Sequence, residues 1–195
     1  MKNVVTILTE NNINGFGNFG GTDKATDHSY DLIYDEIFSP YREKEITLLE
    51  IGVQYGGSAL LWHEFFPNSK LVLIDIKDQV HPSIWEKMDV NKYDYLIRDA
   101  FEASTLDELK LKYPDGFDII VEDGPHTIES QIYTISKYTN LLKKGGLLVI
   151  EDIQRREDCD LIINSITDVP HESVELRDVR HVKGRYDDLM IIVKK

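Results

Sequence analysis

Apolar residues along this chain follow two alternating patterns: short continuous runs, and longer stretches with helical spacing. The short runs are rich in Ile, Leu and Val and have the length of buried strands. We therefore expect strands over residues 46–51, 71–76, 93–97, 117–121 and 147–150. The stretches between and after these runs predict helices over about 58–66, 105–113, 127–142 and 158–166. Two closing runs, at about 173–179 and 188–194, predict a hairpin.

The first forty residues depart from this alternation. Residues 1–9 predict a short or weakly ordered element, and residues 14–21 a flexible loop, because four glycines in eight positions oppose both helix and strand. From Tyr30 to Phe38 the apolar side chains recur every three or four residues. This spacing predicts a helix, which Ser39-Pro40 ends.

Strands that alternate with helices along a chain form parallel sheets with helices on both faces. We therefore expect an α/β, doubly wound fold with a mostly parallel, seven-stranded sheet. Its sixth strand is expected to run parallel to the first five, and the last strand antiparallel because a hairpin joins it to the sixth. At 195 residues the chain has the length of a single domain, residues 1–195.

Composition narrows the classes of function. The net charge of −13 repels phosphate backbones, so we do not expect a nucleic-acid partner. Cys159 is the single cysteine, which excludes an internal disulfide and a thiolate metal cluster. Apolar runs stay short of the roughly 20 residues that span a bilayer, and the first residues do not resemble a secretory leader. We expect a cytoplasmic protein without a membrane partner.

Carboxylates gather directly after two of the predicted strands. Residues 117–121 lead into Glu122-Asp123-Gly124-Pro125-His126, and residues 147–150 lead into Glu151-Asp152. Ligands of open α/β sheets bind outside the carboxyl ends of the strands, so these segments are expected to meet. Clustered carboxylates repel one another unless a cation lies between them, and hard oxygen ligands favour Mg²⁺. The pattern predicts a divalent-metal site with His126 beside it as a general base. The alternatives are a helix-start charge pair at Glu151-Asp152 and a histidine that is only a loop residue.

A glycine-rich turn follows the first strand, at Gly52-Val53-Gln54-Tyr55-Gly56-Gly57-Ser58. It differs from the dinucleotide fingerprint G-x-G-x-x-G, and Glu50 precedes it. Two phosphates near Glu50 would be repelled, whereas a sulfonium and an amino group would be attracted. Asp75, about 20 residues further on, has the place of an acid that accepts ribose hydroxyls, and Asp99-Ala100 that of a contact to the adenine. S-adenosylmethionine is therefore favoured over NAD.

The sequence resembles the class I S-adenosylmethionine-dependent methyltransferases, with their Rossmann-like sheet. It is most similar to the metal-dependent macrolide sugar O-methyltransferases of the mycinamicin and macrocin type. The matching segments span about residues 21–153: they are Gly21-Thr22-Asp23-Lys24 with His28-Ser29-Tyr30, Leu49-Glu50-Ile51-Gly52-Val53 with Gly56-Gly57-Ser58, Phe65-Phe66-Pro67, Ile74-Asp75-Ile76, residues 117–126 and residues 145–152.

The resemblance implies a role for each matching residue. It implies Mg²⁺ or another divalent cation such as Mn²⁺ on Asp123, Glu151 and Asp152, with His126 as the base. It places donor binding at Glu50, Gly52, Ser58 and Asp75, to which we add Asp99, Ala100 and Glu122. It also implies that residues 1–40, through Thr22, Lys24 and His28, close over the donor. Two features depart from the family: Pro125 stands where serine is common, and the chain is shorter, so the macrolide itself is not the expected acceptor.

Taken together, these features predict a metal-dependent O-methyltransferase that acts on a hydroxyl of a sugar or glycan. A catechol-like phenol is the alternative acceptor, and a non-catalytic S-adenosylmethionine-binding domain the alternative function. The segment 180–187 follows the sixth strand and is locally basic in an acidic chain. We expect it to border the acceptor pocket through Arg180, His181 and Arg185. A homo-oligomer is compatible with these predictions.

Overall fold

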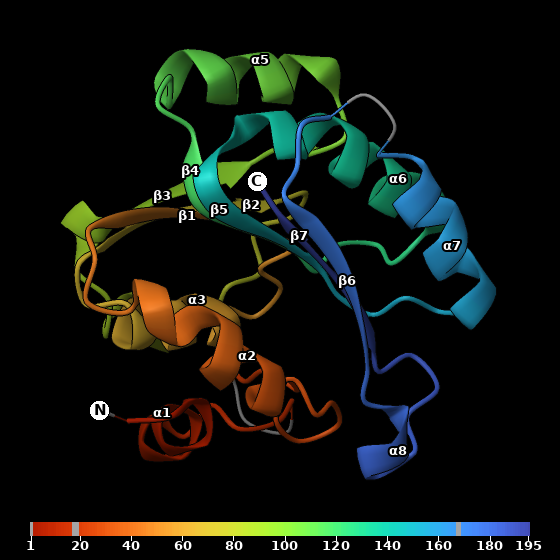
Figure 1. Ribbon diagram of the computed structural model, residues 1–195. Coiled ribbons are helices and arrows are strands. Elements are labelled where there is room, and N and C mark those ends of the chain that lie inside the picture. The colour runs from red at the N-terminus through yellow and green to blue at the C-terminus, as the bar shows by residue number, and fades with distance from the viewer. Residues whose placement is uncertain (1, 17–19, 167–168) are drawn as a thin grey trace.

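A seven-stranded sheet forms the centre of the molecule in the computed structural model, which describes residues 2–16, 20–166 and 169–195 (Figure 1). The strand order across the sheet is β3-β2-β1-β4-β5-β7-β6. The strands are β1 (Ile46–Ile51), β2 (Ser69–Asp75), β3 (Tyr93–Ile97), β4 (Phe117–Glu122), β5 (Leu142–Ile150), β6 (Ser173–Asp178) and β7 (Leu189–Lys194).

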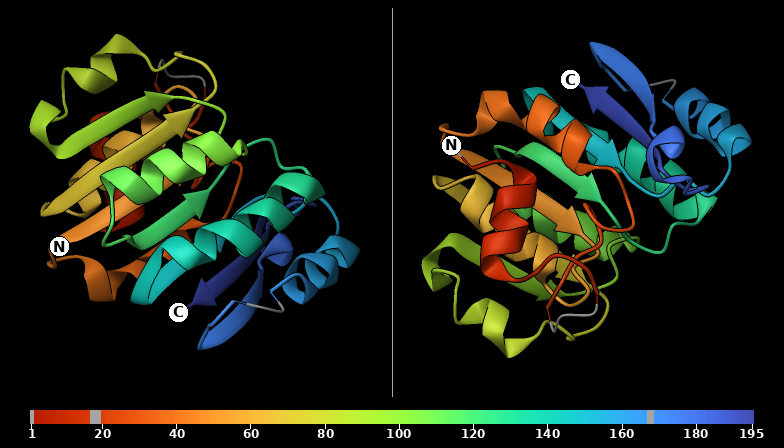
Figure 2. Two further views of the ribbon diagram at one scale, coloured as in Figure 1. Left: turned by 90° about the horizontal axis from the view of Figure 1, so that it is seen from above. Right: turned by 90° about the horizontal axis from the view of Figure 1, so that it is seen from below.

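Strand directions confirm the predicted topology. β1 pairs in parallel with β2 and β4, β2 with β3, and β4 with β5. β7 is antiparallel to both β5 and β6, so β6 runs in the same direction as the first five strands. Figure 2 shows the parallel strands pointing to one edge of the sheet, with β7 running against them. The fold is thus α/β and doubly wound, with an antiparallel last strand.

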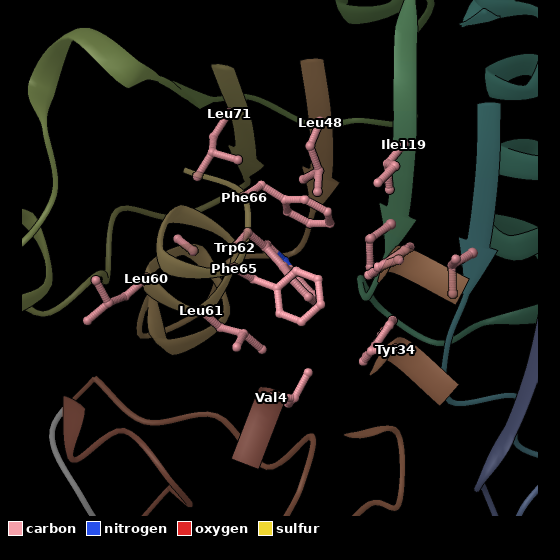
Figure 3. Close-up of a cluster of buried hydrophobic side chains, with 14 of the residues drawn as sticks. Val4, Tyr34, Leu48, Leu60, Leu61, Trp62, Phe65, Phe66, Leu71 and Ile119 are labelled. Carbon is pink, nitrogen blue, oxygen red and sulfur yellow. The ribbon is translucent and has the colours of Figure 1, made fainter. Parts of the chain in front are cut away.

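Helices cover both faces of the sheet (Figure 1). One face packs against α1 (Val4–Asn11), α2 (Asp31–Phe38) and α3 (Gly57–Phe65), and the other against α5 (Ala103–Lys112), α6 (Ile128–Lys137) and α7 (Arg156–Asn164). Figure 3 shows the first core: Trp62, Phe65 and Phe66 of α3 and its end lie beneath β2, β1 and β4. Tyr34 of α2 meets Trp62 edge-on, with ring centroids 5.0 Å apart.

Element boundaries differ from the sequence prediction at the end of the 127–142 helix. α6 ends at Lys137, a 3₁₀ turn follows at Tyr138–Leu141, and β5 already begins at Leu142. The strand is longer than its apolar run because Leu142 pairs with Phe117 of β4, and because Lys195 N–H donates to the Gly146 carbonyl oxygen (3.0 Å), which keeps the glycine pair in the sheet. The sequence prediction ended the helix at about residue 142 and began the strand at residue 147, whereas pairing with distant segments places residues 142–146 in the strand.

Short helical turns occupy segments for which the sequence predicted none. They are α4 (Pro82–Trp85), the 3₁₀ turns Ser39–Tyr41 and Val90–Lys92, and α8 (Arg180–Lys183) inside the predicted 180–187 loop. At the start of the chain the short element is α1, which the Asn3 side chain caps by accepting from Thr6 N–H. Of the predicted loop 14–21, residues 17–19 lie outside the described part of the chain, and Asn14 pairs with Thr22 beyond it.

The N-terminal segment crosses the first turn of α3 at very short range. A Cβ atom added to Gly57 would overlap the backbone of residues 20–22, so only glycine leaves room for this crossing. Thr22 makes two backbone hydrogen bonds at this crossing. Its N–H donates to Ile13 O (2.9 Å), and its carbonyl oxygen accepts from Gly15 N–H (2.8 Å). The glycine-rich segment at the start of α3 therefore packs directly against the backbone of residues 20–22.

We expect Gly57→Ala to release the N-terminal segment, because the added methyl group and the 20–22 backbone occupy the same space. Overpacking of this kind costs about 1–3 kcal/mol. Limited proteolysis is expected to cut the variant within residues 12–23 faster than the wild type. Ser104→Ala is the control, because Ser104 is exposed on α5, which packs on the other face of the sheet. Equal cleavage of the Gly57→Ala variant and the wild type would contradict the steric account.

Candidate active site

A cavity of about 600 Å³ opens where the parallel strands end. Its walls come from the segments after β1, β2, β3 and β4, together with residues 21–28 and the loop before β7. This is the crevice in which open α/β sheets bind ligands. The described chain lines it with both apolar side chains, such as Ile76 and Phe101, and charged ones.

Most of the predicted site residues line this cavity. From the predicted donor set these are Thr22, His28, Gly52, Ser58, Asp75, Asp99 and Ala100, from the metal set Asp123 and Asp152, and His126 and Arg185 join them. Lys24, Glu50, Glu122 and Glu151 are fully buried behind the wall instead. Arg180 and His181 belong to a separate, open surface depression on α8. The sequence did not single out Phe16, Gln79, Phe101 and Asp187, which also line the cavity.

The turn after β1 is shaped by two close contacts. Gly52 has a φ of +87°, and a Cβ atom there would overlap the Asp123 carbonyl oxygen. Asp75 Oδ2 accepts from the N–H groups of Val53 (2.9 Å) and Gln54 (2.8 Å). Asp75 therefore holds the backbone of the turn while it also faces the cavity. A carboxylate has acceptor capacity beyond these bonds, which leaves room for ribose hydroxyls.

Two buried glutamates flank the turn on opposite faces of the sheet. Glu50 Oε1 accepts from Trp62 Nε1–H (2.8 Å), and Glu122 Oε1 from Gly124 N–H (3.3 Å). The second oxygen of each finds no hydrogen-bond partner among the described residues. Burial raises the pKa of Glu50 to about 7 and that of Glu122 to about 8. Such unsatisfied acceptors beside a cavity are typical of positions that receive a ligand or water.

Asp123, His126 and Asp152 form a compact group at the cavity wall. One ligand atom from each lies within 4.8 Å of the others. His126 Nε2 is 3.2 Å from Asp123 Oδ1, and His126 Nδ1 is 3.6 Å from Asp152 Oδ2. Both His126 (φ +55°) and Asp152 (φ +54°) have left-handed backbones, which side-chain-bearing residues rarely adopt. Strain of this kind concentrates at functional sites.

The N-terminal residues hold the opposite side of the same carboxylates. Lys24 Nζ lies 2.7 Å from Asp123 Oδ2 and 2.6 Å from Glu151 Oε2. Tyr34 donates its hydroxyl hydrogen to Glu151 Oε1. Tyr30 donates to Asp152 Oδ1 (2.5 Å). The structure thus brings Asp123 and Asp152 together with His126, and places Glu151 behind them.

Charge in this group is set by burial and by the neighbouring ions. Burial raises the pKa of Glu151 despite Lys24, whereas Lys24 and His126 lower the pKa of Asp123 against the effect of its burial. Burial opposes the charge on His126, but the hydrogen bond and charge of Asp123, with the charge of Asp152, raise its pKa to about 9. Attraction to Asp123 and Glu151 likewise outweighs burial and raises the pKa of Lys24.

A second charged group joins the N-terminal segment to the loop before β7. His28 Nδ1 is 2.7 Å from Asp188 Oδ1, and Arg185 Nε donates to Asp187 Oδ1 (3.1 Å). Lys183 Nζ donates to the carbonyl oxygens of Ala25 (2.9 Å) and His28. The segment 180–187 therefore borders the cavity through Arg185 and Asp187, while Arg180 pairs with Asp178 at the surface (2.7 Å).

The residues present fit both groups that the sequence predicted. Asp123 and Asp152 offer hard oxygen atoms toward one point beside His126, which suits Mg²⁺ or Mn²⁺. The free acceptors of Glu50 and Glu122, the open turn at Gly52 and the apolar Ile76 and Phe101 suit a ligand with an amino group, hydroxyls and a flat ring. His28, Asp187 and Asp188 are also close enough for a cation, but His28 and Arg185 already supply positive charge there.

Comparisons with known proteins identify the family and the fold. Residues 49–153 match a family model described as a methyltransferase domain. The chain is 28% identical over 148 residues to the 8-demethyl-8-alpha-L-rhamnosyl tetracenomycin-C 2'-O-methyltransferase of Streptomyces olivaceus, with 69% of this chain and 35% of the relative covered. It is 31% identical over 133 residues to the mycinamicin VI 2''-O-methyltransferase of Micromonospora griseorubida, covering 65% and 32%. The chain thus spans about a third of the length of these relatives.

Among solved structures, the MycE methyltransferase of the mycinamycin biosynthetic pathway, in complex with Mg, SAH and mycinamycin VI, superposes with a TM-score of 0.73. The sequence identity is 22%, and the superposition covers 100% of this chain and 53% of MycE. This likeness shows that the two chains share a fold. Among the described helices, none has the length and apolar character that a membrane crossing requires.

Replacement of Tyr30 by Phe is expected to destabilise the folded protein. The buried Asp152 Oδ1 loses the hydroxyl donor that lies 2.5 Å from it. Loss of a hydrogen bond to a charged group costs about 1.5–3 kcal/mol of unfolding free energy. Urea denaturation would measure this loss. Tyr186→Phe is the matched control, since its hydroxyl binds Gln154 at an exposed position and is expected to cost under about 0.5 kcal/mol. A Tyr30→Phe variant as stable as that control would show that the bond contributes nothing.

Proposed function

Since the chain belongs to the family of methyltransferase domains, we propose that it is an S-adenosylmethionine-dependent O-methyltransferase that requires a divalent cation and methylates a hydroxyl of a sugar or glycan. The observation that carries this proposal is the grouping of Asp123, Asp152 and His126 on the wall of one cavity that the glycine-rich turn also lines. A cation, a base and a methyl donor would then share one crevice.

In this proposal the donor lies against the turn after β1. Asp75 accepts from the ribose hydroxyls, and Asp99, Ala100 and Phe101 border the adenine ring of the donor. Gly52 and Ser58 provide backbone and hydroxyl contacts, and Thr22 and His28 approach from the N-terminal segment. Glu50 and Glu122 act from behind the wall, where burial favours their neutral forms. A donor that carries a sulfonium and an amino group would favour their ionised forms, which attract it in turn.

His126 is proposed to take the proton from the acceptor hydroxyl. The acceptor oxygen then attacks the sulfonium methyl group in line, the bond between sulfur and methyl breaks, and S-adenosylhomocysteine leaves. A plain hydroxyl has a pKa near that of water, far above that of imidazole, so histidine alone is a poor base for it. Asp123 and Asp152 would hold a divalent cation, which would supply the missing acidity by lowering the pKa of an oxygen bound to it. Asp123 and Asp152 flank the His126 ring, one at each ring nitrogen, and their charge keeps the ring protonated. A divalent cation bound by the two carboxylates would offset that charge and leave a ring nitrogen able to accept the proton.

A sugar hydroxyl is favoured as the acceptor because the two curated relatives are named as 2'-O- and 2''-O-methyltransferases of a rhamnosyl tetracenomycin and of mycinamicin VI. Neighbouring hydroxyls of a sugar offer a cation two oxygens at once. Arg185, which is about two-fifths exposed and lines the cavity beside Asp187, is proposed to contact the acceptor. A catechol offers the same pair of oxygens and is the second candidate acceptor.

Removal of the His126 imidazole is expected to lower turnover by about 10²–10⁴-fold, the usual contribution of a general base. Donor affinity is expected to be unchanged, because His126 lies on the acceptor side of the cavity wall. His126→Ala would be compared with His171→Ala, an exposed histidine distant in sequence from the group. Turnover of labelled donor and calorimetric donor binding measure the two effects. Full activity of His126→Ala would reject its role as the base.

Chelation is expected to abolish methyl transfer, and added Mg²⁺ or Mn²⁺ to restore it. The assay uses labelled S-adenosylmethionine with a panel of rhamnosides and other glycosides, and in parallel with catechols. Transfer to glycosides alone supports the sugar assignment, and transfer to catechols alone replaces it with the second candidate. Activity that persists in EDTA would contradict the metal requirement, and donor binding without transfer to either panel would point to a non-catalytic domain.

A further inference from the structure

Lys24 occupies an unusual place for a lysine. Its side chain is 1% exposed, and its ammonium group contacts both oxygens of Glu151 (2.8 and 2.6 Å) and Oδ2 of Asp123 (2.7 Å). In the part of the chain that the structure describes, it is the one lysine or arginine paired with either carboxylate. A buried lysine is costly unless it is paired and hydrogen-bonded, and these three contacts use all three of its donors.

The carboxylates divide their oxygens between two sides. Asp123 Oδ2 and both oxygens of Glu151 face Lys24, and Asp152 Oδ1 faces Tyr30. Asp123 Oδ1 and Asp152 Oδ2 face His126 on the cavity side. The ammonium group of Lys24 is therefore already paired with the inner oxygens of Asp123 and Glu151, close to the point where a cation would bind.

We propose that Lys24 is a built-in counter-ion of the cation site: it neutralises Asp123 and Glu151 from within and competes with a bound divalent cation for the same negative charge. This inference rests on the proposed cation site. It makes the folded chain stable before the cation arrives, and it weakens cation binding, because like charges at this distance in a buried site repel. It also ties the N-terminal segment, which carries Lys24, to the occupancy of the site.

The test replaces Lys24 with Met, which keeps most of the side-chain length and removes the charge. In EDTA the melting temperature is expected to fall by about 10 °C, because a buried carboxylate loses its partner. Mn²⁺ is expected to restore most of this loss, so that the Mn²⁺-induced shift exceeds that of the wild type. By linkage, the dissociation constant for Mn²⁺, measured by electron paramagnetic resonance, is expected to fall by about tenfold or more.

Lys143→Met is the matched control. Lys143 pairs with Asp118 (2.7 Å) near the other end of β4, and its removal is expected to leave the Mn²⁺-induced shift unchanged. If Lys24→Met does not fold in EDTA, the double variant Lys24→Met/Glu151→Gln decides, because it removes a charge from each partner. Recovery of a folded double variant supports the counter-ion role, and failure to fold overturns it.

The outcomes separate this inference from the proposed function. A wild type that binds no Mn²⁺ and gains no stability from it removes the cation site itself. A wild type that binds Mn²⁺, with a Lys24→Met variant whose affinity is equal or weaker, overturns the counter-ion role alone and leaves the cation site in place. Tighter binding by Lys24→Met supports both.

Discussion

The architecture of the site depends on the pairing of buried carboxylates with partners from the N-terminal segment. Asp123, Glu151 and Asp152 stand at the ends of two adjacent strands, where the surrounding apolar cores make an unpaired charge costly. Lys24, Tyr30 and Tyr34 supply a cation and two hydroxyls to them from a loop and helix that lie 99 to 127 residues away in sequence. The N-terminal segment is therefore a structural part of the site as well as part of the cavity wall.

The sequence predicted the sheet because its information is local. Continuous apolar runs marked the strands, and the bounds expected for β1 and β3 agree with the structure. The gathering of Asp123, His126 and Asp152 also followed from sequence, because topology alone brings the ends of parallel strands to one edge. Where a boundary depended on a distant partner, as for β5 and its contact with Lys195, the local signals predicted a later start of the strand.

The division of the site into a cavity wall and a layer behind it was not foreseen. Strand alternation places Glu50 on the face of Trp62 and Glu122 on the opposite one, so neither side chain points along the strand into the cavity. Tyr30 and Tyr34 appeared in the sequence as part of an apolar helix face. A buried tyrosine usually needs a partner for its hydroxyl, and that signal was available, but the identity of the partner depends on tertiary structure. Lys24 carried no local signal of burial.

The contact between Gly52 and the Asp123 carbonyl oxygen couples two regions to which we assign separate parts of the proposed reaction. One belongs to the turn at the proposed donor position, and the other to the strand end that bears Asp123, a proposed cation ligand. No side chain fits between them, so a change in the position of one segment requires a matching shift of the other. Descendants of this chain would be expected to change acceptors readily, through the loop before β7, while the spacing between donor and cation stays fixed.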